Sequence, residues 1–412
     1  MMTLILFGTA LAGCLGTDES DETETETAAV VVTDAGYTYA SNVDNHRALM
    51  KDLCDIKSAA SSDGGYDFAT AKDIYTNGKN AEKSDGSFRT LAGFASADGK
   101  NHGYDAYYNQ SGSVDAHITA AMDGTGDFAG TSDTVRYQGI AKLTANMGMV
   151  AYTIHELNSA VAKADAGNVD NDSGAPHNWD EGWAFFHGPD EDWSCSPAYT
   201  MKKRAADYGT ETDGVSNALS STEAAMVAGL AALQAEDSAG YTAATDTVVK
   251  NVIITYSQAT LKYASKMDNA DSGEKYQVEG YAFWKAIEAY AAPHTDNACY
   301  NMDTHTMGWI GSSAAAACDS FIWTNGSQEA NGTADTCYNT VSHTVAMGIA
   351  NETQCGAFSS MYFYENYGAT SMNNIFDLSD ASQLGTSYDV TAWLQPVWDH
   401  YGITAEDIGT YA

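Results

Sequence analysis

The stretch KLTANMGMVAYTIHELNSAVAKAD, residues 142–165, indicates the fold class of this chain. Its apolar residues recur at alternating steps of four and three, a spacing that places their side chains on one face of an α-helix. These residues are Leu143, Met147, Val150, Ile154, Leu157, Val161 and Ala164. The stretch therefore predicts one long amphipathic helix that packs its apolar stripe against a core.

Two further helices follow from the same kind of pattern. Residues 247–267 carry a second stripe, and the segment Ser220-Ser-Thr-Glu223 has the form of a capping box that opens a third helix. The chain has only five prolines, and no convincing run of alternating apolar and polar residues predicts a sheet. We expect a mainly α fold.

A short segment occurs twice. The sequence DEGWAF at residues 180–185 returns as VEGYAF at residues 278–283, and each copy follows a predicted long helix and a polar loop. Such recurrence is typical of a duplicated helix–loop–helix unit. We predict an internally duplicated helical bundle, with the two units near residues 136–190 and 245–292.

The cysteines predict long loops held by disulfides. Residues 123–132 and 297–339 are dense in Gly, Asn, Asp and Ser, which favours loops. Six of the seven cysteines follow Cys14, an even number that suits three disulfides outside the cytoplasm. Fifteen pairings are possible in principle. The sequence has no C-x-x-C pair, which argues against a zinc–thiolate site.

The N-terminal residues predict export and anchoring. Residues 1–13 are apolar and end in Leu-Ala-Gly before Cys14, like a signal peptide with a lipobox whose cysteine receives lipid. The alternative is an ordinary signal peptide that is cleaved without lipidation. Residues 14–40 then form an acidic, extended tether, and residues 41–412 form the helical domain. We expect an extracytoplasmic protein that the lipid on Cys14 anchors to the membrane.

The charge of the chain bears on its partners. It has 55 Asp and Glu residues against 19 Lys and Arg residues, a net charge of -36. Binding to a nucleic-acid backbone depends on clustered Lys and Arg, so nucleic acid is excluded as a partner. Such a surface attracts cations instead.

Glu181 and Glu279 are the equivalent glutamates of the repeated segment. On a helix each lies one turn before a phenylalanine, Phe185 or Phe283, so both carboxylates should be partly buried. The glycine that follows each glutamate costs about 1 kcal/mol of helix propensity, which suggests a close approach by another group. For Glu181 a structural alternative is a capping box with Asn178.

Other polar residues surround Glu181 in the predicted structure. His177 lies near it in the sequence, and His155 and Glu156 lie on the preceding helix, away from its apolar stripe. Imidazole and carboxylate groups together suit Fe³⁺ or Fe²⁺. The alternative is a solvated polar face. We predict that approximate two-fold symmetry brings Glu181 and Glu279 into one pocket, where a bound cation relieves their repulsion.

Two other classes of function fit the same residues. Glu181 and Glu279 could act as the acid/base carboxylates of an extracytoplasmic, glycosidase-like hydrolase. A surface or adhesion protein without a small ligand is the third possibility. The metal content of the purified protein separates the iron-binding reading from both.

Together these segments resemble a known family, the low-iron-inducible periplasmic proteins, also called iron-assimilating proteins. The similar pieces are IYTNGKN at residues 74–80, RTLAGFA at residues 89–95, the helix with His155 and Glu156, and the two Glu-Gly-aromatic-Ala-Phe segments. The resemblance runs from about residue 45 onward. It implies secretion, expression under iron limitation, and iron acquisition by binding rather than catalysis. Apart from the resemblance, an iron permease is one partner to which the iron could be delivered.

Overall fold

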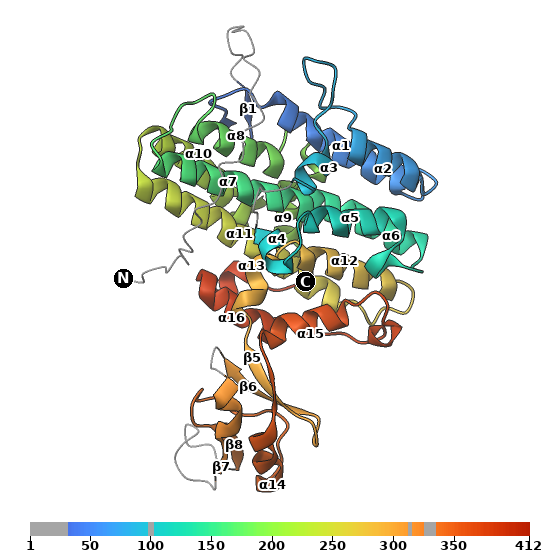
Figure 1. Ribbon diagram of the computed structural model, residues 1–412, viewed down its shortest axis with the longest axis vertical. Coiled ribbons are helices and arrows are strands. Elements are labelled where there is room, and N and C mark those ends of the chain that lie inside the picture. The colour runs from blue at the N-terminus through green and yellow to red at the C-terminus, as the bar shows by residue number, and fades with distance from the viewer. Residues whose placement is uncertain (1–31, 98–102, 312–314, 325–334) are drawn as a thin grey trace.

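The computed structural model describes residues 32–97, 103–311, 315–324 and 335–412. The predicted signal peptide at residues 1–13, the lipid site at Cys14 and most of the tether lie outside the described residues. Figure 1 shows a body of packed helices, from which a small region with strands and one short helix projects.

The helices of the body account for most of the described chain. They are α1 (Asp44–Ala60), α2 (Phe68–Asn77), α3 (Leu91–Ala95), α4 (Gly103–Tyr108), α5 (Ser113–Asp123), α6 (Asp133–Lys142), α7 (Met149–Asp165), α8 (Ala175–Phe186), α9 (Pro197–Tyr208), α10 (Asn217–Gln234), α11 (Ser238–Ser265), α12 (Gly273–Lys285), α13 (Glu288–Ala291), α15 (Tyr367–Ile375), α16 (Thr391–Tyr401) and α17 (Ala405–Ile408). Two short hairpins lie among them, β1 (Thr33–Asp34) with β2 (Tyr37–Thr38) and β3 (Glu211–Thr212) with β4 (Val215–Ser216). The prediction of a mainly α fold is confirmed.

The predicted helix over residues 142–165 is part of a longer helical rod. α6 passes into a π-helical segment, Leu143–Gly148, which leads directly into α7. The side chains of Thr144 and Asn146 bond to the backbone carbonyls four residues earlier, and such bonds compete with the regular helical ladder. The stripe faces the core as expected, since Leu143, Met147, Val150, Ile154 and Leu157 are buried.

This rod lies at the centre of the helical body. α7 packs against α8 and α11, while α11 packs against α10 and α12, and α12 returns to α6. The same order is visible in Figure 1, where α7, α8, α10 and α11 lie side by side. α1 closes one side by packing against α6 and α8. The body therefore buries one continuous apolar core.

Two details of the predicted helices differ in the structure. α11 begins at Ser238, nine residues before the predicted start at residue 247 (247 − 238). The predicted capping box at Ser220 is wrong, because α10 begins at Asn217 and its cap is Ser216, whose hydroxyl accepts a hydrogen bond from the Leu219 amide. Thr and Ser residues follow one another here, so the sequence offered several equivalent starts.

Both copies of the repeated segment lie on the second helix of a helix–loop–helix pair. The pairs are α7 with α8 and α11 with α12, and the two helices of each pair pack on one another. An internal duplication of the whole bundle stays a prediction, because these pairings alone do not establish it.

The three predicted disulfides are present. Cys54 pairs with Cys195 and joins α1 to the segment before α9, Cys299 pairs with Cys318, and Cys337 pairs with Cys355. The second and third disulfides both lie in the projecting region of Figure 1, which follows α13 and precedes α15. They hold a segment too small to bury a large core of its own.

The expectation of long loops at residues 297–339 is wrong, because the projecting region contains short strands. They are β5 (Asn297–Asn301), β6 (Thr306–Gly311), β7 (Phe321–Thr324), β8 (Thr336–Asn339) and β9 (Tyr362–Tyr364), with α14 (Glu352–Gly356) beside them. β5 pairs with β6 and β9, and β7 pairs with β8, all antiparallel. The strands are so short that turn residues dominate the local composition and obscure the alternating pattern.

A turn recurs within this projecting region. CYNMDTHT at residues 299–306 and CYNTVSHT at residues 337–344 form matching turns. In the first, Tyr300 bonds to His305 Nδ1 at 2.8 Å, and in the second Tyr338 bonds to His343 Nδ1 at 2.8 Å. In each turn the asparagine after the tyrosine accepts two backbone amide bonds. Side-chain bonding of this kind stabilises tight turns.

No helix among the described residues is both long enough and apolar enough to cross a membrane.

Candidate metal centre

Five titratable side chains meet where α1, α7 and α8 pack together, and we call them the Glu181 cluster. They are His46 on α1, His155 and Glu156 on α7, and His177 and Glu181 on α8. The contact of α8 with both α7 and α1 brings these distant parts of the sequence into one place. Four of the five predicted ligands are therefore neighbours.

Glu181 lies at the centre of the cluster. Its Oε1 atom is 3.1 Å from His46 Nε2 and 3.2 Å from His177 Nε2. His177 is one helical turn earlier on α8, so these two side chains share a face. The capping-box alternative with Asn178 is wrong, because α8 begins at Ala175 and both residues lie inside the helix.

Glu156 lies beside Glu181 in the interior. An interaction with the side chain of Glu156 helps to lower the pKa of Glu181. Asn178 Nδ2 donates to Glu156 Oε2 at 2.6 Å and to Glu181 Oε2 at 3.4 Å. His155 Nε2 lies 4.0 Å from Glu156 Oε1. The side chains of Glu156 and Glu181 are only 5% and 13% exposed, so solvent does little to screen their repulsion.

The histidines control the charge of Glu181. Burial alone would raise the pKa of Glu181, but the charge of His46 and the hydrogen bond and charge of His177 outweigh it. The pKa of this carboxyl group therefore lies well below its usual value. Glu181 is held as a carboxylate with two imidazole nitrogens directed at one of its oxygen atoms.

A chain of hydrogen bonds orients His177. Its Nδ1 atom lies 2.9 Å from the Ser41 hydroxyl, which itself donates to Asp180 at 2.7 Å. Tyr37 also donates to Asp180, and burial raises the pKa of Asp180 to about 6. Because the Ser41 proton points to Asp180, Nδ1 of His177 is the donor to Ser41, and Nε2 faces Glu181. Such support behind a histidine fixes which nitrogen can bind a metal.

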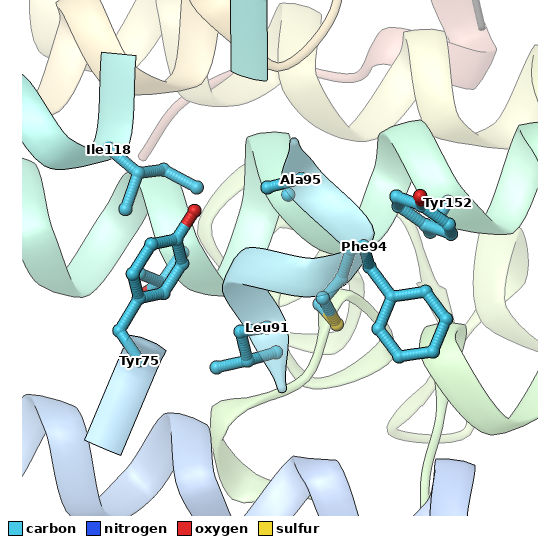
Figure 2. A pocket seen from close by; sticks show the side chains of 9 residues that line it. Tyr75, Leu91, Phe94, Ala95, Ile118 and Tyr152 are labelled. Atoms are coloured by element: carbon cyan, nitrogen blue, oxygen red, sulfur yellow. The ribbon is translucent and has the colours of Figure 1, made fainter. Parts of the chain in front are cut away.

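Aromatic side chains cover the cluster. The ring of Phe94 lies 5.8 Å from His46 and 4.8 Å from both Tyr152 and Phe185. Figure 2 shows Phe94 beside Tyr152, with Leu91 and Ala95 of the same short helix α3 lining the adjacent apolar pocket. This apolar cover lowers the local dielectric and strengthens every charge interaction inside.

Metal binding by the Glu181 cluster stays a prediction. Ligand atoms bound at roughly 2.1 Å to one ion lie roughly 3 Å from each other, and the two Nε2–Oε1 distances of 3.1 and 3.2 Å match that separation. In the described part of the chain, no group of three His, Cys, Asp or Glu side chains already surrounds a single ion position. The side chains contact one another instead, with both imidazole Nε2 atoms against Glu181 Oε1.

Glu279, the fifth predicted ligand, lies in a different environment on α12. Its Oε1 atom is 4.0 Å from Lys142 Nζ, and burial together with the charge of Glu279 raises the pKa of Tyr263 to about 12. Its side chain is 7% exposed, as the repeat predicted. The partners of Glu279 are thus a lysine and a tyrosine, whereas those of Glu181 are histidines and a second carboxyl group. Its convergence with Glu181 on one ion stays a prediction.

Sequence reasoning missed His46 and Asn178 as members of this site. His177 and Glu181 are four residues apart, so helical spacing alone places them together. His46 has no such signal, because it is a single histidine on a helix far away in the chain. Only the packing of α1 on α8 reveals it.

The fold and the cluster define a disulfide-bonded helical protein with a buried carboxylate–histidine centre. A family model, described as low iron-inducible periplasmic protein, matches residues 21–294, which is more than half of the chain. The chain belongs to this family, as its sequence resemblance predicted. No curated protein and no solved structure matches it significantly.

Family membership implies a role in iron assimilation when iron is scarce. The family description is periplasmic, and the three disulfides fit an extracytoplasmic location. The match ends at residue 294, so the projecting region with β5 to β9 follows the matched residues.

Proposed function

We propose that this protein binds iron at the Glu181 cluster and assists its uptake from outside the cytoplasm, without catalysing a reaction. The observation that carries the proposal is the meeting of two buried carboxyl groups, Glu156 and Glu181, which both accept from Asn178, beside three histidines. A cation bound between the two carboxyl groups would relieve the repulsion of their charges. Iron is the cargo that the family implies.

The donor set favours iron over the alternatives. Two carboxylates offer hard oxygen ligands, which suit Fe³⁺, and three imidazoles suit Fe²⁺ equally well. The six cysteines after Cys14 are all in disulfides, so no thiolate is available among them to favour softer metals. Asn178 and the Ser41–Asp180 pair orient Glu156 and His177 from behind.

Glu279 has a smaller part than Glu181 in the proposed iron binding. Lys142 already neutralises part of its charge, so Glu279 has less need of a cation than Glu181 has. The hydrolase alternative gains no support from these contacts, because a working acid/base pair needs both carboxyl groups at one substrate. We further propose the lipid anchor on Cys14 and delivery of the iron to a permease.

Titration of the iron-free protein with Fe³⁺ and Fe²⁺ tests the proposal. We expect one high-affinity ion per chain in the wild type and a loss of about 100-fold or more in affinity when both Glu156→Gln and Glu181→Gln are introduced, since even the loss of a residue that supports a ligand typically costs 10- to 100-fold. Circular dichroism checks that the double variant keeps its helices. Glu236→Gln, a change at an exposed glutamate, is the matched control.

Two outcomes would contradict this assignment. A folded double variant that keeps wild-type stoichiometry and affinity would remove both carboxylates from the site. A wild-type protein that binds neither oxidation state would remove iron as the cargo of this chain.

A further inference from the structure

Exposed apolar side chains gather in the projecting region of Figure 1, which contains β5 to β9. Six of the nine large apolar side chains that are exposed among the described residues lie there, although this region is a small part of the chain. They are Met302, Ile322, Val341, Val345, Met347 and Tyr362. Exposed apolar groups that gather in one place indicate a binding surface.

Two methionines lie next to each other on the sheet of this region. Tyr300 of β5 lies opposite Met307 of β6. On the other side of β6, the bridge between Gly308 and Ala346 places Met347 opposite Met307, and the Met347 amide donates to the Met307 carbonyl oxygen at 3.2 Å. Opposite residues of antiparallel strands share a face, with their Cβ atoms about 4.5 to 5.5 Å apart. The side chains of Tyr300, Met307 and Met347 are therefore neighbours on one face.

This face of the sheet points away from the small core of the projecting region. Gly308, which follows Met307, is buried, and a Cβ atom there would lie 2.7 Å from the ring of Phe321. Successive residues of a strand point to opposite faces, so Met307 points away from Phe321. Met347 is 56% exposed, as this orientation requires. The two thioether groups are thus accessible from solvent.

His305 lies at the end of the same face. Its Nδ1 atom is 2.8 Å from the hydroxyl group of Tyr300, whose side chain is the neighbour of Met307. His305 is exposed and precedes Met307 by two residues. Because Tyr300 engages Nδ1, Nε2 is the nitrogen that His305 can offer to a ligand. Histidines that bind metals typically have such a partner on their other nitrogen.

The second copy of this turn shows that the methionines are not needed to build it. Tyr338 and His343 form the same contact, with 2.8 Å between the hydroxyl group and Nδ1. Val345 forms a bridge with Tyr338, in the place that Met307 has opposite Tyr300. The second turn therefore has the tyrosine and the histidine but a valine in place of the thioether.

We propose that His305, Met307 and Met347 bind Cu⁺. Thioether sulfur selects this soft ion, and imidazole also suits copper, whereas hard ions such as Fe³⁺ prefer oxygen ligands. The methionine side chain has three rotatable bonds, so two neighbouring sulfur atoms can turn toward one ion without a change in the backbone. The chain has no Lys or Arg after Lys285, so no permanently charged residue of this segment repels the ion.

This copper site is separate from the proposed iron site. It shares no residue with the Glu181 cluster, and it lies after residue 294, where the match to the family model ends. Glu181→Gln should therefore leave Cu⁺ binding unchanged, which distinguishes a failure of the iron site from a failure of this one.

Titration of the iron-free full chain with Cu⁺, kept reduced by ascorbate and in competition with a colorimetric Cu⁺ chelator, tests the proposal. Every protein carries Cys14→Ser, which removes the cysteine that is not in one of the three disulfides. We expect a bound Cu⁺ whose affinity falls at least about tenfold in Met307→Leu and in His305→Gln, since even the loss of a residue that supports a ligand typically costs that much. His343→Gln, the same change in the second turn, is the matched control and should bind normally.

Nuclear magnetic resonance of the methionine methyl groups gives a second measurement. Addition of Ag⁺, a redox-stable substitute for Cu⁺, should shift the signals of Met307 and Met347. A folded Met307→Leu, Met347→Leu double variant with the Cu⁺ affinity of the wild type would overturn the proposal. Equal losses in His305→Gln and His343→Gln would also overturn it, because they would show that the thioethers do not select the first turn.

Discussion

α8 and α12 contain nearly the same six residues, yet their glutamates have opposite neighbours. Glu181 of α8 lies against His46 and His177, and Asn178 donates both to it and to Glu156. Glu279 of α12 lies against Lys142. Neither His46 nor Lys142 belongs to the repeated segment, since each comes from another helix. Local sequence thus sets the burial of these carboxylates, and the packed neighbours set their electrostatic environment.

The chemical nature of the neighbour decides what each carboxylate can do. A histidine can release its proton near neutral pH and then offer a nitrogen lone pair to a metal. A lysine ammonium has no lone pair while it is charged, so beside a carboxylate it forms an ion pair. We therefore expect the Glu181 environment to take a cation and the Glu279 environment to exclude one.

The largest expected difference between the two regions is in iron binding. Glu181→Gln should weaken iron affinity by about 100-fold, because it removes a ligand and leaves Glu156 as the remaining carboxylate. Glu279→Gln should change the affinity by no more than about threefold, because Lys142 already compensates that charge. Competition with a chelator of known affinity measures both. Equal losses in the two variants would show that the glutamates serve one ion.

The second largest difference should be in stability, when the glycine that follows each glutamate is replaced by alanine. A Cβ atom at Gly280 would lie 2.1 Å from the ring of Phe376, whereas one at Gly182 would lie 3.1 Å from a terminal methyl group of Leu157. Gly280→Ala should therefore cost about 2 to 3 kcal/mol through overpacking. At Gly182 the contact of the added Cβ atom is milder. The gain of about 1 kcal/mol in helix propensity should offset the cost of that contact in Gly182→Ala.

Denaturant unfolding of these two glycine variants measures the difference in stability. A Gly280→Ala variant as stable as Gly182→Ala would mean that α12 and the segment containing Phe376 are not packed as closely as the structure has them.

The ion pair between Lys142 and Glu279 should contribute a smaller amount to the free energy of unfolding. Lys142→Gln leaves the buried carboxylate of Glu279 without its cation, at an expected cost of about 1 to 2 kcal/mol, because the pair is long and Lys142 is 26% exposed. Adding Glu279→Gln should recover part of that loss. A double-mutant cycle from urea unfolding gives the coupling energy. Purely additive effects would show that the two charges do not interact.

The smallest expected difference is in the dependence of stability on pH. Burial, together with the neighbouring cations, lowers the pKa of Lys142 from 10.5 to about 8. Between these values the unfolded chain holds a proton that the folded chain has lost, so this residue makes stability rise as pH rises from 8 to 10.5. We expect about 1 kcal/mol of added stability, which Lys142→Gln should lack.

Glu181 should make stability depend on pH in the acidic range. Its pKa in the fold lies below its usual 4.5, so its contribution to stability is complete above pH 4.5 and is lost as the pH falls below that value. Melting temperatures of the wild type, Lys142→Gln and Glu181→Gln across both pH ranges check the two signs. If the Lys142→Gln variant keeps the full rise in stability between pH 8 and 10.5, groups other than Lys142 cause that rise.

The sequence predicted the parts of this fold that depend on local periodicity. The stripe from Leu143 to Leu157 identified the central helix, because a four–three spacing can bury only one face of a helix. The even number of cysteines after Cys14 predicted three disulfides, although not their pairing. The strands around Cys299 and Cys337 were missed, and the repeated Cys-Tyr-Asn turn was the signal that could have identified them.

By itself the sequence determined the helical class, the export-type disulfides, the resemblance to iron-assimilating proteins and the burial of two equivalent glutamates. Each of these follows from residue types and spacings within a few turns of chain. Only the tertiary structure decided that His46 of α1 faces Glu181 and that Lys142 of α6 faces Glu279. Charge interactions act through space, and the partners of a buried carboxylate come from whichever helices the core packs beside it.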